Sequence, residues 1–304
     1  MSDHLLHPTY HGRFAPTPSG PLHFGSLTTA LASWLDARHR QGLWSVRIED
    51  VDIPRCSLDT ASLILKQLEA HGLYWDGPVL AQRDRGEHYK TALLTLLNQK
   101  QVYPCSCSRS SWSRHGLYPG WCRSGPLKPR AQMAWRLNTL SAQDPIMHWH
   151  DERHGALQRD VRTLGDVILR RRDGLWGYQL AVVVDDALQG ITHVVRGDDL
   201  LNNTPWQRLL QQHLGCSAPR YLHVPLVIMP NGRKLSKQNH APALSLHAND
   251  CRRSLHQALK ALGQRPLAAH AHLPVAEQLQ WATPRWNPAQ LPAPGTTVKH
   301  QSVV

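Results

Sequence analysis

The chain has 304 residues, which is enough for one large domain or two modest ones with a substantial core. Its net charge of +12, from 34 Lys and Arg against 22 Asp and Glu, favours a polyanionic partner such as nucleic acid, although solubility alone could also explain it. No stretch reaches the roughly 18 apolar residues of a membrane-spanning helix, no secretory signal opens the chain, and six cysteines make no disulfide framework. We therefore expect a cytoplasmic protein without a membrane partner.

The first hundred residues alternate between strand-like and helix-like segments. In chain order, their patterns predict a strand over 10–15, a helix over 27–40, a strand over 43–48, and helices over 59–71 and 88–99. Gly42 and Gly72 end the first two helices. This order is typical of an α/β fold in which helices cover a parallel sheet.

The second half of the chain gives further short elements before an irregular end. Its patterns predict strands over 133–137, 166–169 and 221–229, and helices over 204–214 and 255–262. The apolar run at 180–184 ends in Asp185 and Asp186 and is typical of a buried parallel strand. From Pro284 onward the chain is rich in proline and lacks periodicity, so we expect a mobile tail there.

Residues 104–130 interrupt the alternation and hold three cysteines within 18 residues, Cys105, Cys107 and Cys122. No run of apolar residues surrounds them, so a metal site is favoured over buried core thiols. A structural zinc ion takes four ligands, mostly sulfur. Two candidates for the fourth ligand, His115 and Tyr118, lie between the second and third cysteine, and histidine is the chemically ordinary choice.

A loop rich in proline and glycine follows the first predicted strand. Its prolines hold it extended, and Gly20 and Gly25 allow the backbone to approach a ligand closely. A helix that begins near Gly25 presents N–H groups and a positive dipole end, with His23 at its mouth, and this arrangement suits a phosphate. Far downstream, the segment 234–238 carries two lysines that could close over the same phosphates.

In this order, the two loops resemble the two ATP-binding motifs of class I aminoacyl-tRNA synthetases. His23-Phe24-Gly25-Ser26 stands where the family has His-Ile-Gly-His, and Lys234-Leu235-Ser236-Lys237-Gln238 stands where it has Lys-Met-Ser-Lys-Ser. The resemblance covers residues 13–243 and implies a Rossmann-like α/β catalytic domain with a parallel sheet, an inserted zinc-bearing subdomain and a short helical extension. It also implies catalytic roles for His23 and Lys237, Mg²⁺ accompanying the ATP, and ATP contacts from Pro16, Gly20, His23, Gly25, Ser26, Lys234, Ser236 and Lys237.

The residues expected to select the amino acid resemble those of glutamyl-tRNA synthetases. The segment 13–17 is similar to the Arg-x-Ala-Pro-Ser start of that group, and 194–200 is similar to its Val-Arg-Gly-x-Asp-Leu segment. The two carboxylates of glutamate call for two arginines, and the resemblance favours Arg196 for the side-chain carboxylate. Glu49 matches the acidic residue that holds the substrate ammonium. The implied glutamate-binding residues are Arg13, Ala15, Thr17, Glu49, Tyr178 and Arg196, although each taken singly could be an ordinary ion pair or core edge.

The same family places a tyrosine at position 118, so the implied zinc ligands are Cys105, Cys107, Tyr118 and Cys122. The expected organisation has the first half of the catalytic domain at 1–103 and the zinc insertion at 104–130. The rest of the acceptor-like insertion and the second half of the catalytic domain follow at 131–243, and a short helical extension with a mobile tail occupies 244–304.

The 66 residues after Gln238 are too few for the helical domain that reads the anticodon in full synthetases, so the chain resembles a truncated branch of the group. That branch is expected to act as a monomer, to activate L-glutamate with ATP to glutamyl-adenylate, and to transfer the glutamate to queuosine in the anticodon arm of tRNA(Asp). Two alternatives stay open: a synthetase fragment that charges the 3′ end of tRNA(Glu), and a catalytically dead paralogue that only binds RNA.

Overall fold

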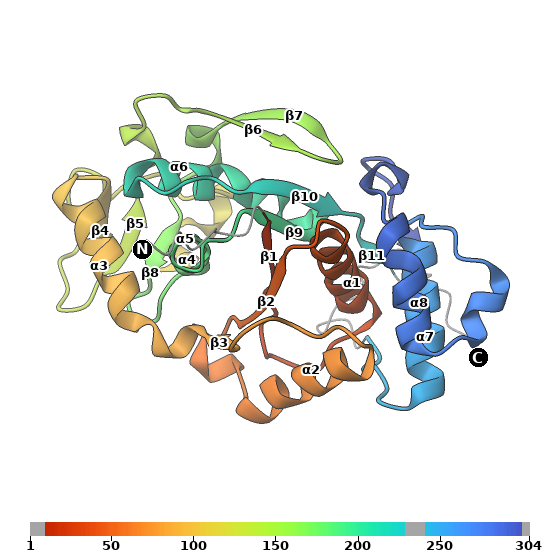
Figure 1. Cartoon of the computed structure of the whole chain (residues 1–304). Helices are drawn as coiled ribbons and strands as arrows, with labels where there is room; N and C mark the ends of the chain where they lie inside the picture. The colour runs from red at the N-terminus through yellow and green to blue at the C-terminus, as the bar shows by residue number, and fades with distance from the viewer. Residues whose placement is uncertain (1–9, 229–240, 300–304) are drawn as a thin grey trace, which may run out of the picture.

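A computed structural model describes residues 10–228 and 241–299 of the chain. Within these residues the central sheet has seven strands in the order β3-β2-β1-β9-β10-β6-β7 (Figure 1). They are β1 (His11–Phe14), β2 (Leu43–Ile48), β3 (Leu80–Ala81), β6 (Ile146–Asp151), β7 (Gly155–Asp160), β9 (His193–Gly197) and β10 (Arg220–Val224). The prediction of an α/β fold with a parallel sheet is confirmed, except that the edge strand β7 runs antiparallel to its neighbour.

Two hydrophobic cores hold the described helices and sheets together. Leu27, Leu31 and Leu35 of α1 pack into one core with Trp44 and Leu259, and the C-terminal helices lie beside α1 on one side of the molecule (Figure 1). A second core lies between α3, α5 and α6. The helices are α1 (Phe24–His39), α2 (Leu58–Ala70), α3 (Gly86–Asn98), α4 (Arg109–Trp112), α5 (Tyr178–Leu188), α6 (Thr204–Leu214), α7 (Ala248–Ala261) and α8 (Val275–Ala282).

Two smaller sheets complete the described fold. An antiparallel sheet of β4 (Val102–Cys105), β5 (Ala134–Leu137) and β8 (Ile168–Arg170) carries the cysteine-rich segment. The short strands β11 (Val227–Ile228) and β12 (Val298–Lys299) pair in parallel. The strand expected over 221–229 is therefore split, because Pro225 has no N–H group to donate to a ladder.

The apolar run at 180–184 is helical, and the strand prediction is wrong. It forms the middle of α5, where every residue from Gln179 to Asp186 is buried, so the run shows no amphipathic period. Packing on all sides outweighs the low helix propensity of three consecutive valines. Gly177 precedes the helix because a Cβ at this position would lie 2.3 Å from the carbonyl oxygen of Ile168.

The chain after Pro284 differs from the expected mobile tail. Trp286 and Leu291 are buried in the same core as α1, and the Trp286 indole donates to Asp36 at 2.9 Å. The described part of this segment reaches β12, which pairs with β11. Frequent prolines remove the helical or strand period from a sequence, but they do not prevent single apolar side chains such as Trp286 and Leu291 from packing into a core. No helix of the described residues is both long and apolar enough to span a bilayer.

Candidate active site and cysteine centre

Two adjoining cavities open at the carboxyl ends of β1, β2 and β9, where parallel α/β sheets bind ligands. The larger, of about 470 Å³, extends over the amino end of α1, and the smaller, of about 370 Å³, reaches down to Glu49 and Tyr178. The two share one wall, which is formed by Phe14, Ala15, Thr17, Thr29, Gly197 and Leu200. A ligand in one cavity would therefore lie beside a ligand in the other.

The larger cavity is built around the start of α1. His23 is the N-cap: its Nδ1 accepts from the N–H of Ser26 at 3.3 Å, and the Ser26 hydroxyl accepts from the N–H of His23 at 3.2 Å. This reciprocal cap fixes the imidazole at the positive end of the helix. Pro16, His23, Gly25 and Ser26 line this cavity as the sequence predicts, whereas Gly20 is not among its lining residues.

Lys234, Ser236 and Lys237 fall in the segment 229–240, outside the described residues. The described residues on both sides of that segment lie at the larger cavity. Val227 lines it, and Ala243 forms a bridge with His23. The N–H of Leu244 donates to the Leu22 carbonyl at 2.8 Å, which ties the returning chain to the loop that precedes α1.

The smaller cavity gathers the residues expected to bind glutamate from four elements. Arg13 lies on β1, Glu49 follows β2, Arg196 lies on β9, and Tyr178 begins α5. All six predicted glutamate-binding residues line this cavity: Arg13, Ala15, Thr17, Glu49, Tyr178 and Arg196. The structure thus brings together side chains that are up to 183 positions apart in sequence (13 to 196).

A buried ion-pair network supports one side of this cavity. Asp186 accepts from Arg13 Nε at 3.0 Å and contacts Arg47 Nη2 at 2.8 Å, and the same Arg47 nitrogen is 3.3 Å from Glu49 Oε1. Burial works to raise the pKa of Asp186, but the two arginines lower it below its usual value. Burial raises the pKa of Glu49, which the two arginines only partly offset. Both carboxylates are nearly inaccessible to water.

Arg196 is held differently, because all of its hydrogen-bond partners are neutral. Its Nε donates to His223 Nε2 at 2.9 Å, Nη1 donates to Gln207 Oε1 at 2.7 Å, and Nη2 donates to the Thr204 hydroxyl at 2.9 Å. The residue is 4% exposed, and within the described parts of the chain no carboxylate pairs with it. A buried guanidinium with only neutral contacts favours an anionic ligand.

Sequence reasoning missed the residues that hold these arginines. The sequence pattern places Asp186 at the end of a strand, and it indicates no role for Arg47, which lies two residues before Glu49. His223 has no signal beyond being a lone histidine in an apolar strand. An aspartate pair that ends a buried apolar run was the one signal that could have pointed to Asp186.

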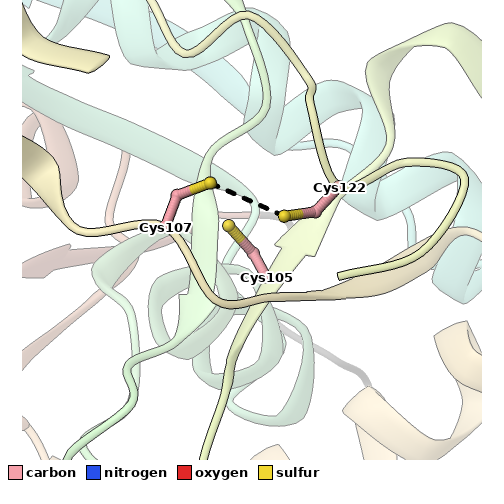
Figure 2. Close-up of side chains that lie close together, drawn as sticks. All are labelled: Cys105, Cys107 and Cys122. Atoms are coloured by element: carbon pink, nitrogen blue, oxygen red, sulfur yellow. Dashed lines mark hydrogen bonds between the residues drawn. The ribbon is translucent and has the colours of Figure 1, made fainter. Parts of the chain in front are cut away.

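The three clustered cysteines come together in the structure (Figure 2). The Sγ atoms of Cys105, Cys107 and Cys122 all lie within 4.8 Å of one another, and those of Cys107 and Cys122 are 3.6 Å apart. A tetrahedral zinc ion with bonds of about 2.3 Å would place its sulfurs about 3.8 Å apart, so the spacing fits a metal site. Burial works to raise the pKa of Cys122, but hydrogen bonds from Tyr118 and from backbone N–H groups lower it to about 6, which favours the thiolate.

Tyr118 lies among these sulfurs and His115 does not join them. The Tyr118 hydroxyl is 3.3 Å from Cys105 Sγ and 3.7 Å from Cys107 Sγ, and it accepts from the N–H of Cys122 at 3.1 Å. His115 is exposed and packs edge-on against Trp121. Arg136 stacks over the Tyr118 ring at 3.8 Å, with Nε 3.3 Å from Cys105 Sγ, so a positive charge accompanies the thiols.

The family model "tRNA synthetases class I (E and Q), catalytic domain" matches residues 9–115 and 131–278. The chain therefore belongs to the class I tRNA synthetases of the glutamate and glutamine type. The match includes the residues that line both cavities. It leaves out residues 116–130, the stretch that contains Tyr118 and Cys122.

Within that class the chain is similar to curated proteins called glutamyl-Q tRNA(Asp) synthetase, which confirms the branch of the group that the sequence predicts. It is 50% identical to the protein of Thiobacillus denitrificans over 289 residues, covering 92% of this chain and 94% of that protein. It is 49% identical to that of Xanthomonas campestris pv. campestris over 286 residues, covering 93% of each chain. It is 47% identical to that of Salmonella typhimurium over 288 residues, covering 93% and 94%.

Solved structures agree on the fold. A glutamate–tRNA ligase from Elizabethkingia meningosepticum, in complex with its amino acid, aligns with a TM-score of 0.78 at 23% identity, covering 95% of this chain and 66% of that chain. A glutamate–tRNA synthetase from Elizabethkingia anophelis gives a TM-score of 0.80 at 23% identity, covering 96% and 68%. The chain thus spans about two thirds of the length of these two enzymes.

Proposed function

We propose that this protein activates L-glutamate with ATP and transfers the glutamyl group to queuosine in the anticodon arm of tRNA(Asp). The smaller cavity would hold glutamate and the larger one ATP. Their shared wall would bring the α-carboxylate of glutamate to the α-phosphate of ATP. The names of the relatives at about 50% identity support the choice of tRNA and of queuosine.

The neutral surroundings of Arg196 are the observation that carries the choice of glutamate. The charges of Arg13 and Arg47 are met by Asp186 and Glu49, whereas Arg196 contacts no carboxylate among the described residues. Glutamate carries one more negative charge than glutamine. We assign its side-chain carboxylate to Arg196 and its ammonium to Glu49, with Arg13, Ala15, Thr17 and Tyr178 completing the site.

Activation requires one oxygen of the glutamate α-carboxylate to attack the α-phosphorus while the bond to the pyrophosphate leaving group breaks. Negative charge accumulates on the phosphates, so fixed positive groups supply much of the catalysis. We assign this role to His23 at the positive end of α1 and to Lys237, with ATP contacts from Pro16, Gly25, Ser26, Lys234 and Ser236. Mg²⁺ would accompany the ATP and offset phosphate charge.

We assign a structural zinc ion to Cys105, Cys107, Tyr118 and Cys122. The convergence of three sulfurs and one phenol oxygen supports this set over one that includes His115. Its role would be to close the segment 104–130 as a unit between the parts of the catalytic domain at 1–103 and 131–243, with 244–304 as a C-terminal extension. We expect the protein to act as a monomer, with its net charge of +12 serving RNA contact.

The test is glutamate-dependent ATP–pyrophosphate exchange, measured without tRNA and with tRNA(Glu) or tRNA(Asp), followed by transfer of labelled glutamate. The proposal expects exchange without tRNA and label only on tRNA(Asp) that contains queuosine. Exchange that depends on tRNA(Glu), with label at its 3′ end, would identify a synthetase fragment instead. The absence of exchange in all three conditions would indicate a dead paralogue.

A further inference from the structure

Behind Arg196 lies a fully buried pair of titratable side chains that the proposed mechanism does not use. His223 on β10 faces Arg196 on β9 in the parallel register, and Asp151 ends the neighbouring strand β6. His223 and Asp151 are both 0% exposed. Asp151 Oδ2 lies 2.6 Å from His223 Nδ1.

The hydrogen bonds define which nitrogen of His223 carries the proton. A guanidinium can only donate, so His223 Nε2 must accept from Arg196 Nε. The proton then sits on Nδ1 and is donated to Asp151. Burial lowers the pKa of His223, which keeps this ring neutral.

Asp151 is fixed by the backbone as well. Its Oδ1 accepts from the N–H groups of Arg153 and His154, both at 3.0 Å, and Oδ2 accepts from the N–H of His223 at 3.1 Å. Burial works to raise the pKa of Asp151, but the hydrogen bond from the His223 ring and those from the His154 and Arg153 N–H groups lower it, so the carboxylate stays ionised. The imidazole ring of His223 stands between this carboxylate and the guanidinium of Arg196.

We propose that His223 and Asp151 are positioning residues that hold Arg196 in place without neutralising it. A carboxylate in direct contact with Arg196 would satisfy the charge that the substrate carboxylate needs. Asp151 fixes the orientation of the neutral His223 ring, and the ring in turn fixes the orientation of the Arg196 guanidinium. The positive charge of Arg196 therefore remains available to the ligand. Because Arg196 is the residue assigned to the side-chain carboxylate, the inference rests on the proposed function. It predicts that His223 sets the affinity for glutamate and the discrimination against glutamine.

Two polar variants of His223 separate positioning from folding. In His223→Gln, the amide oxygen can occupy the place of Nε2 and accept from Arg196. In His223→Asn, the shorter side chain can occupy only the place of Nδ1, so it keeps the contact with Asp151 and loses the one with Arg196. His223→Leu removes both. His193→Leu is the matched control, since His193 is 8% exposed, lies on β9 with Arg196, and stacks on Tyr10 away from both cavities.

The measurement is the KM for glutamate and for ATP in pyrophosphate exchange, together with the thermal midpoint of each variant. We expect His223→Asn and His223→Leu to raise the KM for glutamate by about 10- to 100-fold, with the KM for ATP changed less than about twofold. His223→Gln should stay within about threefold of the parent, and His193→Leu within about twofold. Discrimination between glutamate and glutamine should fall in the Asn and Leu variants alone.

Equal glutamate KM values in folded Asn and Gln variants would overturn the positioning role, as would a parallel rise in both KM values. A parent protein that gives no glutamate-dependent exchange would overturn the proposed function itself. Glutamate-dependent exchange by the parent protein therefore distinguishes a failure of the positioning role from a failure of the proposed function.

Discussion

The two adjoining cavities and the cysteine centre are assembled in opposite ways. The cavities take Arg13, Glu49, Tyr178 and Arg196 from four elements that only the complete sheet brings together. The cysteine centre takes all of its candidate ligands from the 18 residues 105–122. The first site depends on global folding, and the second depends on a local loop that a metal ion can close.

The two regions also differ in how a buried aspartate is used. Asp166, beside the cysteine segment, accepts from Tyr103 at 2.5 Å, Arg123 at 2.6 Å and Thr139 at 2.7 Å, so its hydrogen bonds are satisfied within the protein. Asp186 holds the arginines at the edge of a cavity of about 370 Å³. A closed network stabilises the fold, whereas a network beside a cavity keeps charged groups in position for a ligand.

The largest expected effect concerns Arg196, which lines the smaller cavity and contacts no carboxylate among the described residues. We predict that Arg196→Gln lowers kcat/KM for glutamate activation by roughly 1,000-fold, because the substrate carboxylate would lose its buried partner. Pyrophosphate exchange at saturating ATP measures this loss. Arg220→Gln on β10 is the control, since Arg220 is exposed and lines neither cavity. If Arg196→Gln retained selective exchange with glutamate, the substrate carboxylate would belong to Arg13 instead.

The second-largest expected effect concerns catalysis at the two cavities, and it should leave the cysteine centre unaltered. We predict that Lys237→Ala reduces adenylate formation by about 100-fold or more, because a positive charge on the transition-state phosphates is lost. The thermal midpoint and the bound metal should be unchanged. Lys90→Ala, an exposed residue of α3 paired with Glu87, should leave exchange unaltered. Unchanged activation kinetics in Lys237→Ala would remove this lysine from the mechanism.

Local patterns in the sequence predict much of the fold, and they fail where packing decides the structure. The strand at 43–48 and the helix at 204–214 coincide with β2 and α6, since alternation in the first and a Thr-Pro start with a closing glycine in the second are local signals. The run at 180–184 has no local signal, because burial on all sides removes the helical period.

The same limit applies to the two sites. Cys105, Cys107 and Cys122 could be grouped from their spacing alone, and the structure brings their sulfurs together. Asp186 and His223, the partners that hold the two arginines of the smaller cavity, could not be found this way. Their roles arise from contacts across 173 positions for Arg13 and Asp186, and across 27 for Arg196 and His223.

The third effect separates the two regions through the cysteine centre. We predict that Cys122→Ser lowers the content of bound zinc and the thermal midpoint, the latter by about 5 °C or more. Removal of metal by a chelator should have the same effect on the parent protein. Activation of glutamate should be impaired less than in Arg196→Gln, because the cavities are formed by other elements. Cys56→Ser, outside the cluster, is the control. A Cys122→Ser variant with unchanged zinc content and thermal midpoint would argue against a metal at this centre.

The smallest effect concerns the pH dependence of the closed network. Burial works to raise the pKa of Asp166, but Arg123, Tyr103 and Thr139 lower it below its usual value. A carboxylate whose pKa is lower in the folded state adds stability above the ordinary aspartate pKa of about 4, and this contribution is lost as the pH falls below it. We therefore predict that Asp166→Asn lowers the free energy of unfolding by roughly 2 kcal/mol at pH 7.

The gap between Asp166→Asn and the parent protein should stay constant above about pH 5 and shrink below about pH 4, because the variant has no carboxylate to protonate. Urea unfolding at several pH values measures this gap. Asp173→Asn is the matched control, since Asp173 is exposed and pairs with Arg171 at 2.5 Å, and an exposed pair adds little stability. A gap that is the same at all pH values would mean that Asp166 stabilises the cysteine segment by its shape and hydrogen bonds, and that its charge contributes nothing. The closed network would then differ from the one beside the smaller cavity, where the pKa of Asp186 is lowered by its two arginine partners, Arg13 and Arg47.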